Sequence, residues 1–335
     1  MRLFLLCPGR GSYGRNELGS LQGPSATLDR LDAIRAHLGR PTLRELDAAE
    51  RFSARLHLAG EHASLLTAGA TLADLETLNA ARARIVGVGG NSMGWYTALH
   101  AAGALDLDAM ATLVETFAAY QVDNVIGGQV LYPVVDEDWR PDAALRAVVD
   151  DALRLPGVEL SIRLGGSAVL AGDEPAVRGL MQELPKLGRG RHEYPQRLPL
   201  HSAFHTSLLA GASERAVQDL SALPFRAPSR PLVDGTGRVH RAHADPEELR
   251  RYTLTTQVTE TFDLTACLRV GLGEYAPDAV LLPGPGGSLG SAVAQVMIET
   301  GWRGLRDRKD FADAQAGEQP LLISMNRPEQ RALVV

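Results

Sequence analysis

One short stretch of the chain combines a possible nucleophile with a backbone that would expose it. In GVGGNSMGWYTAL, residues 87–99, Ser92 lies between Gly90 and Gly94, after an apolar run and before residues with helical spacing. A Gly-x-Ser-x-Gly segment between a strand and a helix permits a sharp turn that exposes the serine oxygen. The amino end of the helix can then stabilise an oxyanion. Ser92 is therefore a candidate nucleophile, although the same glycines also suit a tight turn without chemistry.

A serine hydroxyl becomes a good nucleophile only when a base removes its proton. The chain has nine histidines, and two of them, His201 and His205, lie close together in LPLHSAFHTSLL. Spacing alone does not choose between them, and a partly buried structural role fits either one. Both are candidate bases at this point.

The composition excludes several classes of partner and site. The 335 residues include 40 acidic and 34 basic side chains spread along the chain, for a net charge of -6. No basic field is present that would hold nucleic acid or an anionic membrane surface. The two cysteines, Cys7 and Cys267, are too few for a disulfide framework or a zinc site. We therefore expect a soluble, cytoplasmic protein with no bound metal.

The elements that must position Ser92 follow an α/β pattern. The apolar run from Leu3 to Cys7 predicts a buried strand, residues 26–83 have helical spacing, and Arg84 to Val88 predicts the strand that leads to Ser92. From about residue 125 the pattern becomes strand, helix, strand, strand, helix, strand, and its last strand is predicted over 191–200. This βαββαβ order indicates a ferredoxin-like unit inserted into a larger domain.

These patterns predict an α/β fold with an α/β-hydrolase-like core, a parallel sheet and an inserted ferredoxin-like subdomain. The core is assigned to residues 1–124 and 199–300, and the small subdomain to 125–198. Residues 301–335 are predicted to be a C-terminal tail, partly disordered, in which LLISM is a candidate strand.

Several segments, taken in order, match motifs of one known family. They are CPGRGSY (7–13), EHASLLTA (61–68), GNSMG (90–94), GGSAVLAG (165–172), AFHTSLL (203–209) and VLLPGPGGSLG (280–290). The chain thereby resembles the acyl-carrier-protein acyltransferase family, which includes the malonyl-CoA:ACP transacylases of fatty acid synthesis and the acyltransferase domains of polyketide synthases. The resemblance runs from about residue 1 to 300, and the family also carries a ferredoxin-like insertion.

The resemblance implies a mechanism and a set of site residues. His205, in the segment similar to the family's FHSPLM, would be the base that activates Ser92. The serine would attack an acyl-CoA thioester, and the phosphopantetheine thiol of an acyl carrier protein would then accept the acyl group in a ping-pong reaction. The backbone N–H groups of Arg10 and Met93 would hold the oxyanion. Gln257 resembles a glutamine that lies near the family's active site. The alternative is that Gln257 is a solvated residue at the end of a helix. A monomer without bound cofactor is expected.

The chain departs from the family at the positions that select the acyl group. Phe117 stands where malonyl-specific members have an arginine that clamps the free carboxylate. Arg10, His62, Asn91 and Arg163 also replace family residues around the expected acyl pocket. We therefore expect a pocket that is not malonyl-specific and takes either an acyl chain without the extra carboxylate or an unusual one. Arg10 and Arg163 are candidates for a relocated anion site, or they are ordinary surface arginines.

Three functions remain open at this point. The first is an acyl-CoA to carrier-protein acyltransferase of a fatty acid or polyketide pathway. The second is an editing hydrolase of the same fold, which passes acyl groups from carrier proteins to water. The third is a non-catalytic docking subunit, and the presence of both Ser92 and His205 argues against it.

Overall fold

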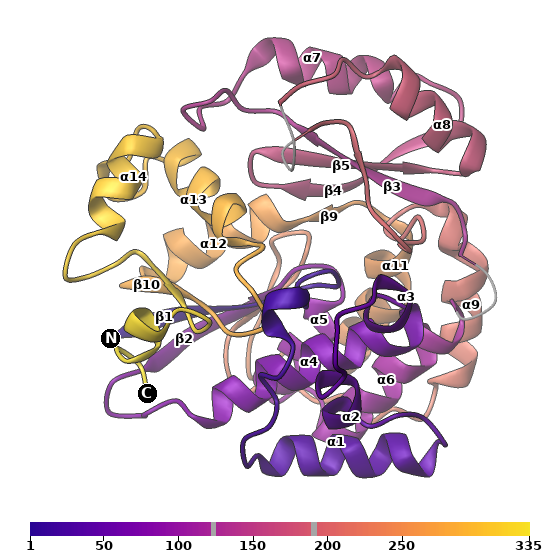
Figure 1. The fold of residues 1–335 in the computed structure, drawn as a ribbon, viewed down its shortest axis with the longest axis vertical. Helices are drawn as coiled ribbons and strands as arrows, with labels where there is room; N and C mark the ends of the chain where they lie inside the picture. The colour runs from indigo at the N-terminus through magenta and orange to yellow at the C-terminus, as the bar shows by residue number, and fades with distance from the viewer. Residues whose placement is uncertain (122–124, 189–192) are drawn as a thin grey trace.

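The computed structural model describes residues 1–121, 125–188 and 193–335. A large sheet lies at its centre, with the strand order β11-β10-β1-β2-β7-β8 (Figure 1). The pairs β11-β10, β10-β1, β1-β2 and β2-β7 are parallel, and β7-β8 is an antiparallel hairpin. The strands are β1 (Arg2–Cys7), β2 (Arg84–Gly90), β7 (Leu232–Val233), β8 (Val239–His240), β10 (Ala279–Leu282) and β11 (Leu322–Ser324).

Helices pack around the large sheet and explain why its central strands are continuously apolar. In Figure 1, α12 and α13 lie between the large sheet and the small subdomain, while α1 and α2 lie at the opposite end of the molecule. The helices of this part are α1 (Ala26–His37), α2 (Leu43–Asp47), α3 (Ala54–His57), α4 (Gly60–Glu76), α5 (Gly94–Ala101), α6 (Leu107–Ala119), α9 (Ala210–Asp219), α10 (Pro246–Arg251), α11 (Gln257–Thr259), α12 (Leu264–Tyr275), α13 (Gly290–Glu299), α14 (Arg308–Gln315) and α15 (Pro328–Arg331). A π-helical turn, Tyr252–Thr256, joins α10 to α11.

The small subdomain has the predicted βαββαβ order. Its elements are β3 (Gly128–Pro133), α7 (Ala143–Ala152), β4 (Val158–Leu164), β5 (Ser167–Gly172), α8 (Glu174–Glu183) and β6 (Gln196–Arg197). The four strands are antiparallel in the order β6-β3-β5-β4, and β9 (Phe262–Asp263) from outside the insertion pairs in parallel with β4. The ferredoxin-like subdomain is thus confirmed.

Both faces of this small sheet are apolar, for different reasons. Val130 and Tyr132 pack with α7 and α8 in a cluster of their own. Leu131, between them, points to the other face and lines a cavity shared with the large sheet's helices. Because side chains alternate along a strand, one short strand supplies both a core and a cavity wall.

The structure differs from the sequence-based prediction in the last strand of the small subdomain and in residues 301–335. The strand predicted over 191–200 begins at residues outside the described ones, and within the described part only Gln196–Arg197 is a strand. The predicted boundary at residue 124 also lies outside the described residues. Residues 301–335 are not a loose tail, because they form α14, β11 and α15, and β11 pairs in parallel with β10. The candidate strand in LLISM is confirmed, and Ile323 within it is fully buried.

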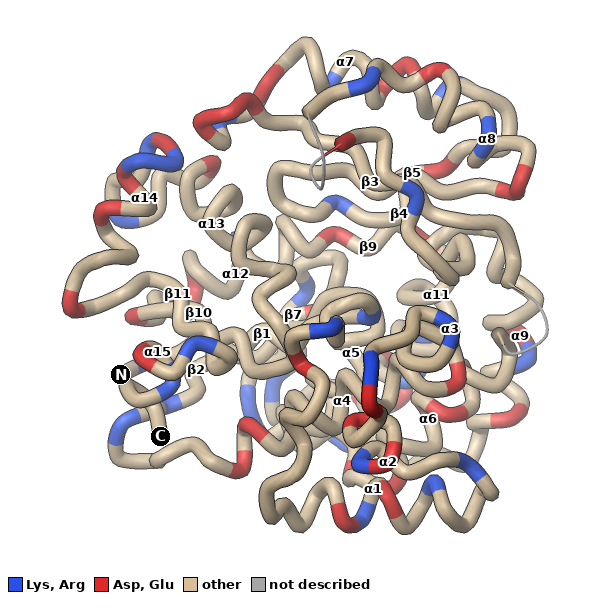
Figure 2. Tube along the Cα trace, in the orientation of Figure 1, with Lys and Arg blue, Asp and Glu red and all other residues tan. Residues whose placement is uncertain are grey.

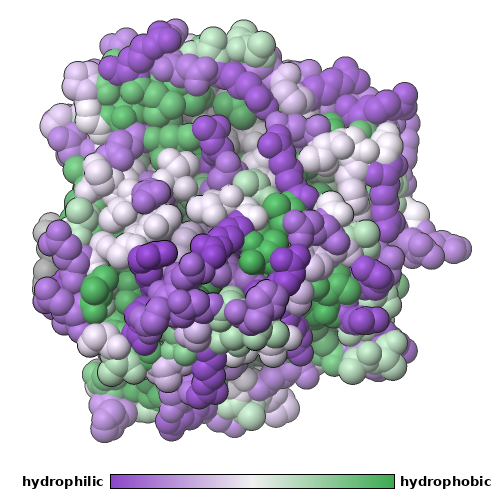
Figure 3. Space-filling view, turned by 180° about the vertical axis from the view of Figure 1, so that it is seen from behind, coloured by the Kyte–Doolittle hydropathy of each residue, from purple (hydrophilic) through white to green (hydrophobic). Residues whose placement is uncertain are grey.

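The outer surface mixes charges of both signs. Acidic and basic residues are interspersed along outer helices such as α1 and α14 (Figure 2). Seen from behind, most of the surface is hydrophilic, and its hydrophobic areas are separated by polar residues (Figure 3). Across the described parts of the chain, none of the helices combines the length and apolar character needed to cross a bilayer.

Candidate active site

Ser92 stands on a sharp turn between β2 and α5. Its φ is +53°, a left-handed value that non-glycine residues rarely adopt. The flanking glycines make the turn possible. A Cβ on Gly90 would lie 2.2 Å from the Gly94 carbonyl oxygen, and one on Gly94 would lie 2.2 Å from the Cys7 carbonyl oxygen. The sequence pattern therefore predicts the local backbone correctly, and the turn directs Ser92 into a cavity.

The Ser92 side chain contacts the His205 imidazole. Ser92 Oγ lies 2.7 Å from His205 Nε2, across 113 positions of sequence. His205 is 1% exposed, and burial lowers its pKa to about 4. The imidazole is therefore neutral at pH 7, and Nε2 is available to accept the serine proton. His201 also lines the cavity, but its Nδ1 bonds to the Pro199 carbonyl oxygen at 2.8 Å, and it makes no hydrogen bond to Ser92 among the described residues.

Among the described residues, His205 is held by main-chain carbonyls and not by a carboxylate. His205 donates from Nδ1–H to the Gln257 carbonyl at 2.5 Å and from its backbone N–H to the Val258 carbonyl at 2.8 Å. These carbonyls belong to the last turn of a helical segment, where no further helical N–H is available to them. The negative end of that segment also favours an imidazolium. The contact at Nδ1 thus leaves the Nε2 lone pair facing Ser92.

The Gln257 side chain ties the nucleophile turn to the same helical segment. Its Nε2 donates to the Ser92 carbonyl at 3.1 Å, and its Oε1 accepts from the Tyr96 hydroxyl at 3.0 Å. Gln257 is buried, so the alternative of a solvated helix-end residue does not hold. Sequence reasoning missed Tyr96. Its position four residues after Ser92, in the first turn of α5, was the available signal.

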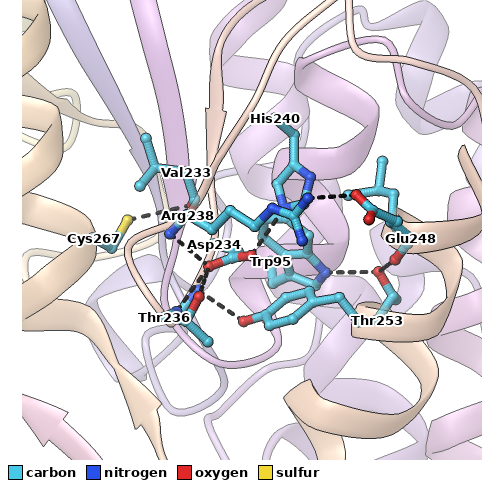
Figure 4. Close-up of polar contacts among 12 residues, drawn as sticks. Trp95, Val233, Asp234, Thr236, Arg238, His240, Glu248, Thr253 and Cys267 are labelled. Atoms are coloured by element: carbon cyan, nitrogen blue, oxygen red, sulfur yellow. Dashed lines mark hydrogen bonds and ion pairs between the residues drawn. The ribbon is translucent and has the colours of Figure 1, made fainter. Parts of the chain in front are cut away.

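A second set of buried contacts fixes the π-helical turn against α5. Trp95 Nε1 donates to Thr253 Oγ1 at 3.0 Å (Figure 4). The Tyr252 ring packs edge-on against Trp95, with ring centroids 5.1 Å apart. The β7-β8 hairpin supports Tyr252 through a backbone hydrogen bond to its hydroxyl, and a buried Asp234–His240 pair at 2.8 Å braces that hairpin. The turn that delivers Gln257 is therefore attached to the helix that follows Ser92.

Two backbone N–H groups beside Ser92 remain available for a ligand. Within the described parts of the chain, the N–H groups of Arg10 and Met93 donate to no protein acceptor. Both residues line the same cavity as Ser92. The loop carrying Arg10 lies close to the nucleophile turn, since a Cβ on Gly9 would lie 2.6 Å from the Asn91 carbonyl oxygen. This arrangement suits an oxyanion hole, which stays a prediction for these two residues.

The cavity beside Ser92 has a volume of about 360 Å³ and a largely apolar wall. Phe117 lines it, is 3% exposed, and stacks on Tyr96 with ring centroids 5.5 Å apart. Further apolar residues that line it, from α6 and the small sheet, are Val114, Leu131, Ile162, Leu164 and Val169. The small subdomain thus supplies one wall of the cavity.

The structure brings together most of the predicted site residues. Besides Ser92 and Phe117, the predicted residues Arg10, Asn91, Met93 and Gln257 line the cavity. Sequence reasoning missed Gln121, which also lines it. It lies one helical turn beyond Phe117, so the spacing again carried the signal.

Two predicted pocket residues, His62 and Arg163, do not line the cavity. His62 is buried elsewhere, and its Nδ1 lies 2.8 Å from the guanidinium of Arg35. Arg163 is exposed, and its Nε lies 3.5 Å from Asp263 Oδ2. The reason for Arg163 is strand alternation, because its neighbour Ile162 points into the cavity and Arg163 points away from it.

Among the residues that the structure describes, no three or more His, Cys, Asp or Glu side chains lie close enough to hold a metal ion. A serine, a neutral histidine and two backbone N–H groups without protein acceptors meet in and beside the cavity. That set can activate a hydroxyl and stabilise a tetrahedral oxyanion, which is what acyl transfer requires.

No protein-family model and no curated protein matches the chain in sequence. Solved structures do match its fold. The acyl-carrier-protein S-malonyltransferase of Burkholderia pseudomallei 1710b is 22% identical with a TM-score of 0.75, covering 99% of each chain. The malonyl-CoA:ACP transacylase of Synechocystis sp. PCC 6803 is 17% identical with a TM-score of 0.74, again covering 99% of each chain. A malonyl-transacylase solved in complex with its type II polyketide synthase acyl carrier protein is 17% identical with a TM-score of 0.74, covering 99% of this chain and 98% of that one. The chain therefore has the α/β fold of the acyl-carrier-protein malonyltransferases.

Proposed function

We propose that this chain belongs to the acyl-carrier-protein acyltransferase family and moves an acyl group from acyl-CoA to the phosphopantetheine thiol of an acyl carrier protein. The observation that carries the proposal is the 2.7 Å contact between Ser92 Oγ and His205 Nε2 beside an apolar cavity. The fold shared with malonyltransferases supports it. Fatty acid or polyketide biosynthesis is the corresponding pathway class.

The reaction has two half-steps at the same serine. In the first, His205 takes the Ser92 proton as Oγ attacks the thioester carbon, and the C–S bond then breaks. The departing CoA sulfur takes the proton from His205, which leaves an acyl-serine. In the second, the carrier thiol gives its proton to His205 and attacks the acyl-serine, and Ser92 leaves with that proton. The N–H groups of Arg10 and Met93 hold the oxyanion in both half-steps.

The acceptor and the acyl group follow from separate observations. One structural neighbour was solved with its acyl carrier protein, which supports a carrier protein as the partner here. Phe117 lines the cavity. From the sequence resemblance, we assign it to the position at which malonyl-specific members have a carboxylate-binding arginine. We therefore propose an acyl pocket that is not malonyl-specific. Acyl-CoA and the carrier arm act as substrates, and the chemistry needs no resident cofactor.

Intact-protein mass spectrometry tests the proposal directly. The protein is mixed with a panel of acyl-CoAs, and a carrier protein bearing its phosphopantetheine arm is then added. We expect an acyl adduct on the wild-type protein and transfer of that adduct to the carrier. Ser92→Ala should form no adduct, while Ser221→Ala, which changes an exposed serine, should behave like wild type.

Two other outcomes would contradict the proposal. An adduct that decays to free acid while the carrier stays unmodified indicates the editing hydrolase. No adduct from any donor indicates the non-catalytic docking subunit.

A further inference from the structure

Strand β4 of the small subdomain has one residue more than the stretch of β5 with which it pairs. Leu160 of β4 pairs with Leu170 of β5. Ile162, two positions later in β4, pairs with Val169, which is the adjacent residue of β5. Ser161 is therefore the extra residue of a β-bulge. Bulges redirect side chains and are frequent next to active sites.

The bulge turns two consecutive side chains towards the large subdomain. Neighbouring side chains of a regular strand point to opposite faces. Leu160 packs in the cluster with α7 and α8, on the outer face, so Ser161 points to the inner face. Because the extra residue shifts the alternation, Ile162 also points inward and lines the cavity beside Ser92. Without the bulge, only one of the two would face inward.

The Ser161 hydroxyl binds the peptide that precedes the base. Its Oγ donates to the Phe204 carbonyl at 2.8 Å. Gln129 Nε2 in turn donates to Ser161 Oγ at 2.8 Å, which directs the hydroxyl proton towards that carbonyl. Ser161 is fully buried and Gln129 is 3% exposed. Burying polar groups in an apolar wall is costly unless they are hydrogen-bonded, and here the bonds end at the residue before His205.

A second contact from β4 lies on the other side of the base. Glu159, two residues before Ser161 and on the same face, accepts a hydrogen bond from the Ser207 backbone N–H at 3.0 Å. It also accepts one from the Ser207 hydroxyl at 2.5 Å. Strand β4 is thus attached to the residue before His205 and to the second residue after it.

The backbone of His205 requires such support. Its φ of +63° is a left-handed value, and a non-glycine residue keeps it only where the surroundings fix it. The helical segment fixes the imidazole and the N–H of His205 through two carbonyls. The hydrogen bond to the Phe204 carbonyl fixes the peptide on the other side of that N–H. A rotation of this peptide would move Nε2 away from Ser92 Oγ.

We propose that Ser161 is a positioning residue for His205, and that the bulge in β4 aims its hydroxyl at the Phe204 carbonyl. The inference rests on the proposed function, in which His205 is the base. In this arrangement the small subdomain holds the base in addition to forming one wall of the cavity. Gln129 orients the Ser161 hydroxyl, and Glu159 provides the second attachment.

Ser161→Ala tests the proposal, because it removes the hydroxyl and retains a small side chain. Acylation of Ser92 is followed by quenched-flow mass spectrometry with the acyl-CoA that reacts fastest in the panel. We expect the maximal rate to fall about tenfold, because Nε2 is less well placed to accept the serine proton. The donor concentration that gives half this rate should stay within about twofold of wild type, since Ile162 still lines the cavity. Ser161→Thr keeps a hydroxyl and should restore most of the rate.

Tyr132→Phe is the matched control. The Tyr132 hydroxyl donates to the Pro185 carbonyl at 3.0 Å, so the variant loses the same kind of bond from the outer face of the same sheet. Its maximal rate should stay within about twofold of wild type. Glu159→Ala changes a partly exposed residue and should lower the maximal rate by a smaller factor than Ser161→Ala. Circular dichroism confirms that each variant is folded.

Three results would overturn the inference. The first is a maximal rate for Ser161→Ala within twofold of wild type. The second is an equal fall in Tyr132→Phe, which would indicate a general loosening of the small sheet. The third is a change in the half-saturating donor concentration alone, which would assign Ser161 to the acyl pocket.

Nitrogen NMR of the histidine side chains separates a failure of this inference from a failure of the proposed function. The nine histidines are labelled with ¹⁵N, and the His205 signals are assigned with His205→Gln. The measurement needs no acyl donor. We expect Ser161→Ala to shift the His205 Nε2 signal more than Tyr132→Phe does. Such a shift supports the positioning role even if the wild-type protein transfers no acyl group. An unchanged signal contradicts that role even if acyl transfer succeeds.

Discussion

Ser92 and His205 both have backbone angles that non-glycine residues seldom adopt. Their φ values are +53° and +63°, and each such residue costs of order 1–3 kcal/mol of strain. Glycines that pack tightly hold Ser92, and the carbonyls of Gln257 and Val258 hold His205. The two side chains are therefore held in place without a bound ligand, which would reduce the reorganisation needed in the proposed acyl transfer.

The assignment of His205 as the base predicts different effects for alanine substitutions at His205 and His201. His205→Ala should lower the rate of acyl-serine formation by about 10³-fold, because Ser92 loses the group that accepts its proton. His201→Ala is the matched control and should lower the rate less than tenfold, because His201 makes no hydrogen bond to Ser92. Single-turnover kinetics with each variant measure both rates. The reverse ranking would transfer the role of base to His201.

Burial of His205 also predicts how the free energy of unfolding depends on pH. Burial lowers its pKa to about 4, against about 6.5 in an unfolded chain. Between these values the unfolded chain binds more protons, so the free energy of unfolding falls as the pH drops from 6.5 towards 4. For this one group the loss between pH 7 and pH 5 is about 2 kcal/mol.

Urea unfolding at the two pH values measures that loss. We expect His205→Gln to lose less stability than wild type on going from pH 7 to pH 5, because glutamine does not titrate. An equal loss in both proteins would show that His205 titrates alike in the folded and unfolded states.

At the scale of elements, the π-helical turn Tyr252–Thr256 helps to position His205. It precedes Gln257, whose carbonyl orients His205, and it is fastened to α5 through the Trp95–Thr253 hydrogen bond. Helix α5, which follows Ser92, and the carbonyl that contacts His205 are thus joined through buried contacts.

Thr253→Val tests this connection. The variant leaves the buried Trp95 indole N–H without an acceptor, which costs about 1–3 kcal/mol. We expect a lower temperature of unfolding and a lower kcat with little change in KM, since the carbonyl that holds His205 shifts while the acyl cavity stays in place. Thr255→Val, in the same turn but partly exposed, is the control and should change neither quantity appreciably. A fall in stability with unchanged kcat would confine Thr253 to a structural role.

At the scale of the whole molecule, the C-terminal segment belongs to the core. β11 pairs with β10, the strand that leads to the turn carrying Ser288 and Leu289 at the cavity. Ile323 is fully buried between neighbouring elements. Strand β11 therefore supports the same sheet whose strand β2 leads to Ser92.

Ile323→Ala measures that support. Removing a buried isoleucine side chain to alanine costs about 2–5 kcal/mol, from lost burial and the cavity left behind. We expect a loss of this size in urea unfolding. Val335→Ala, which changes an exposed residue, should cost less than about 0.5 kcal/mol. A negligible loss for Ile323→Ala would restore the view of this segment as a tail.

The sequence by itself determined the local features. The glycines around Ser92 specified the turn because no larger residue fits at Gly90 or Gly94. The alternation of strand and helix signals specified the βαββαβ subdomain, since hydrophobic periodicity is a property of short segments. Resemblance of AFHTSLL to a family motif, and not spacing, singled out His205.

Only the tertiary structure decided which distant residues share the cavity. Asn91 and Met93, expected there from the resemblance, line the cavity. Arg163 and His62 do not, because the orientation of a side chain depends on strand and helix packing that spacing does not reveal. Ion pairs are likewise visible only in three dimensions, since they join residues that are far apart in sequence, as the pair of Arg35 with Glu115 shows.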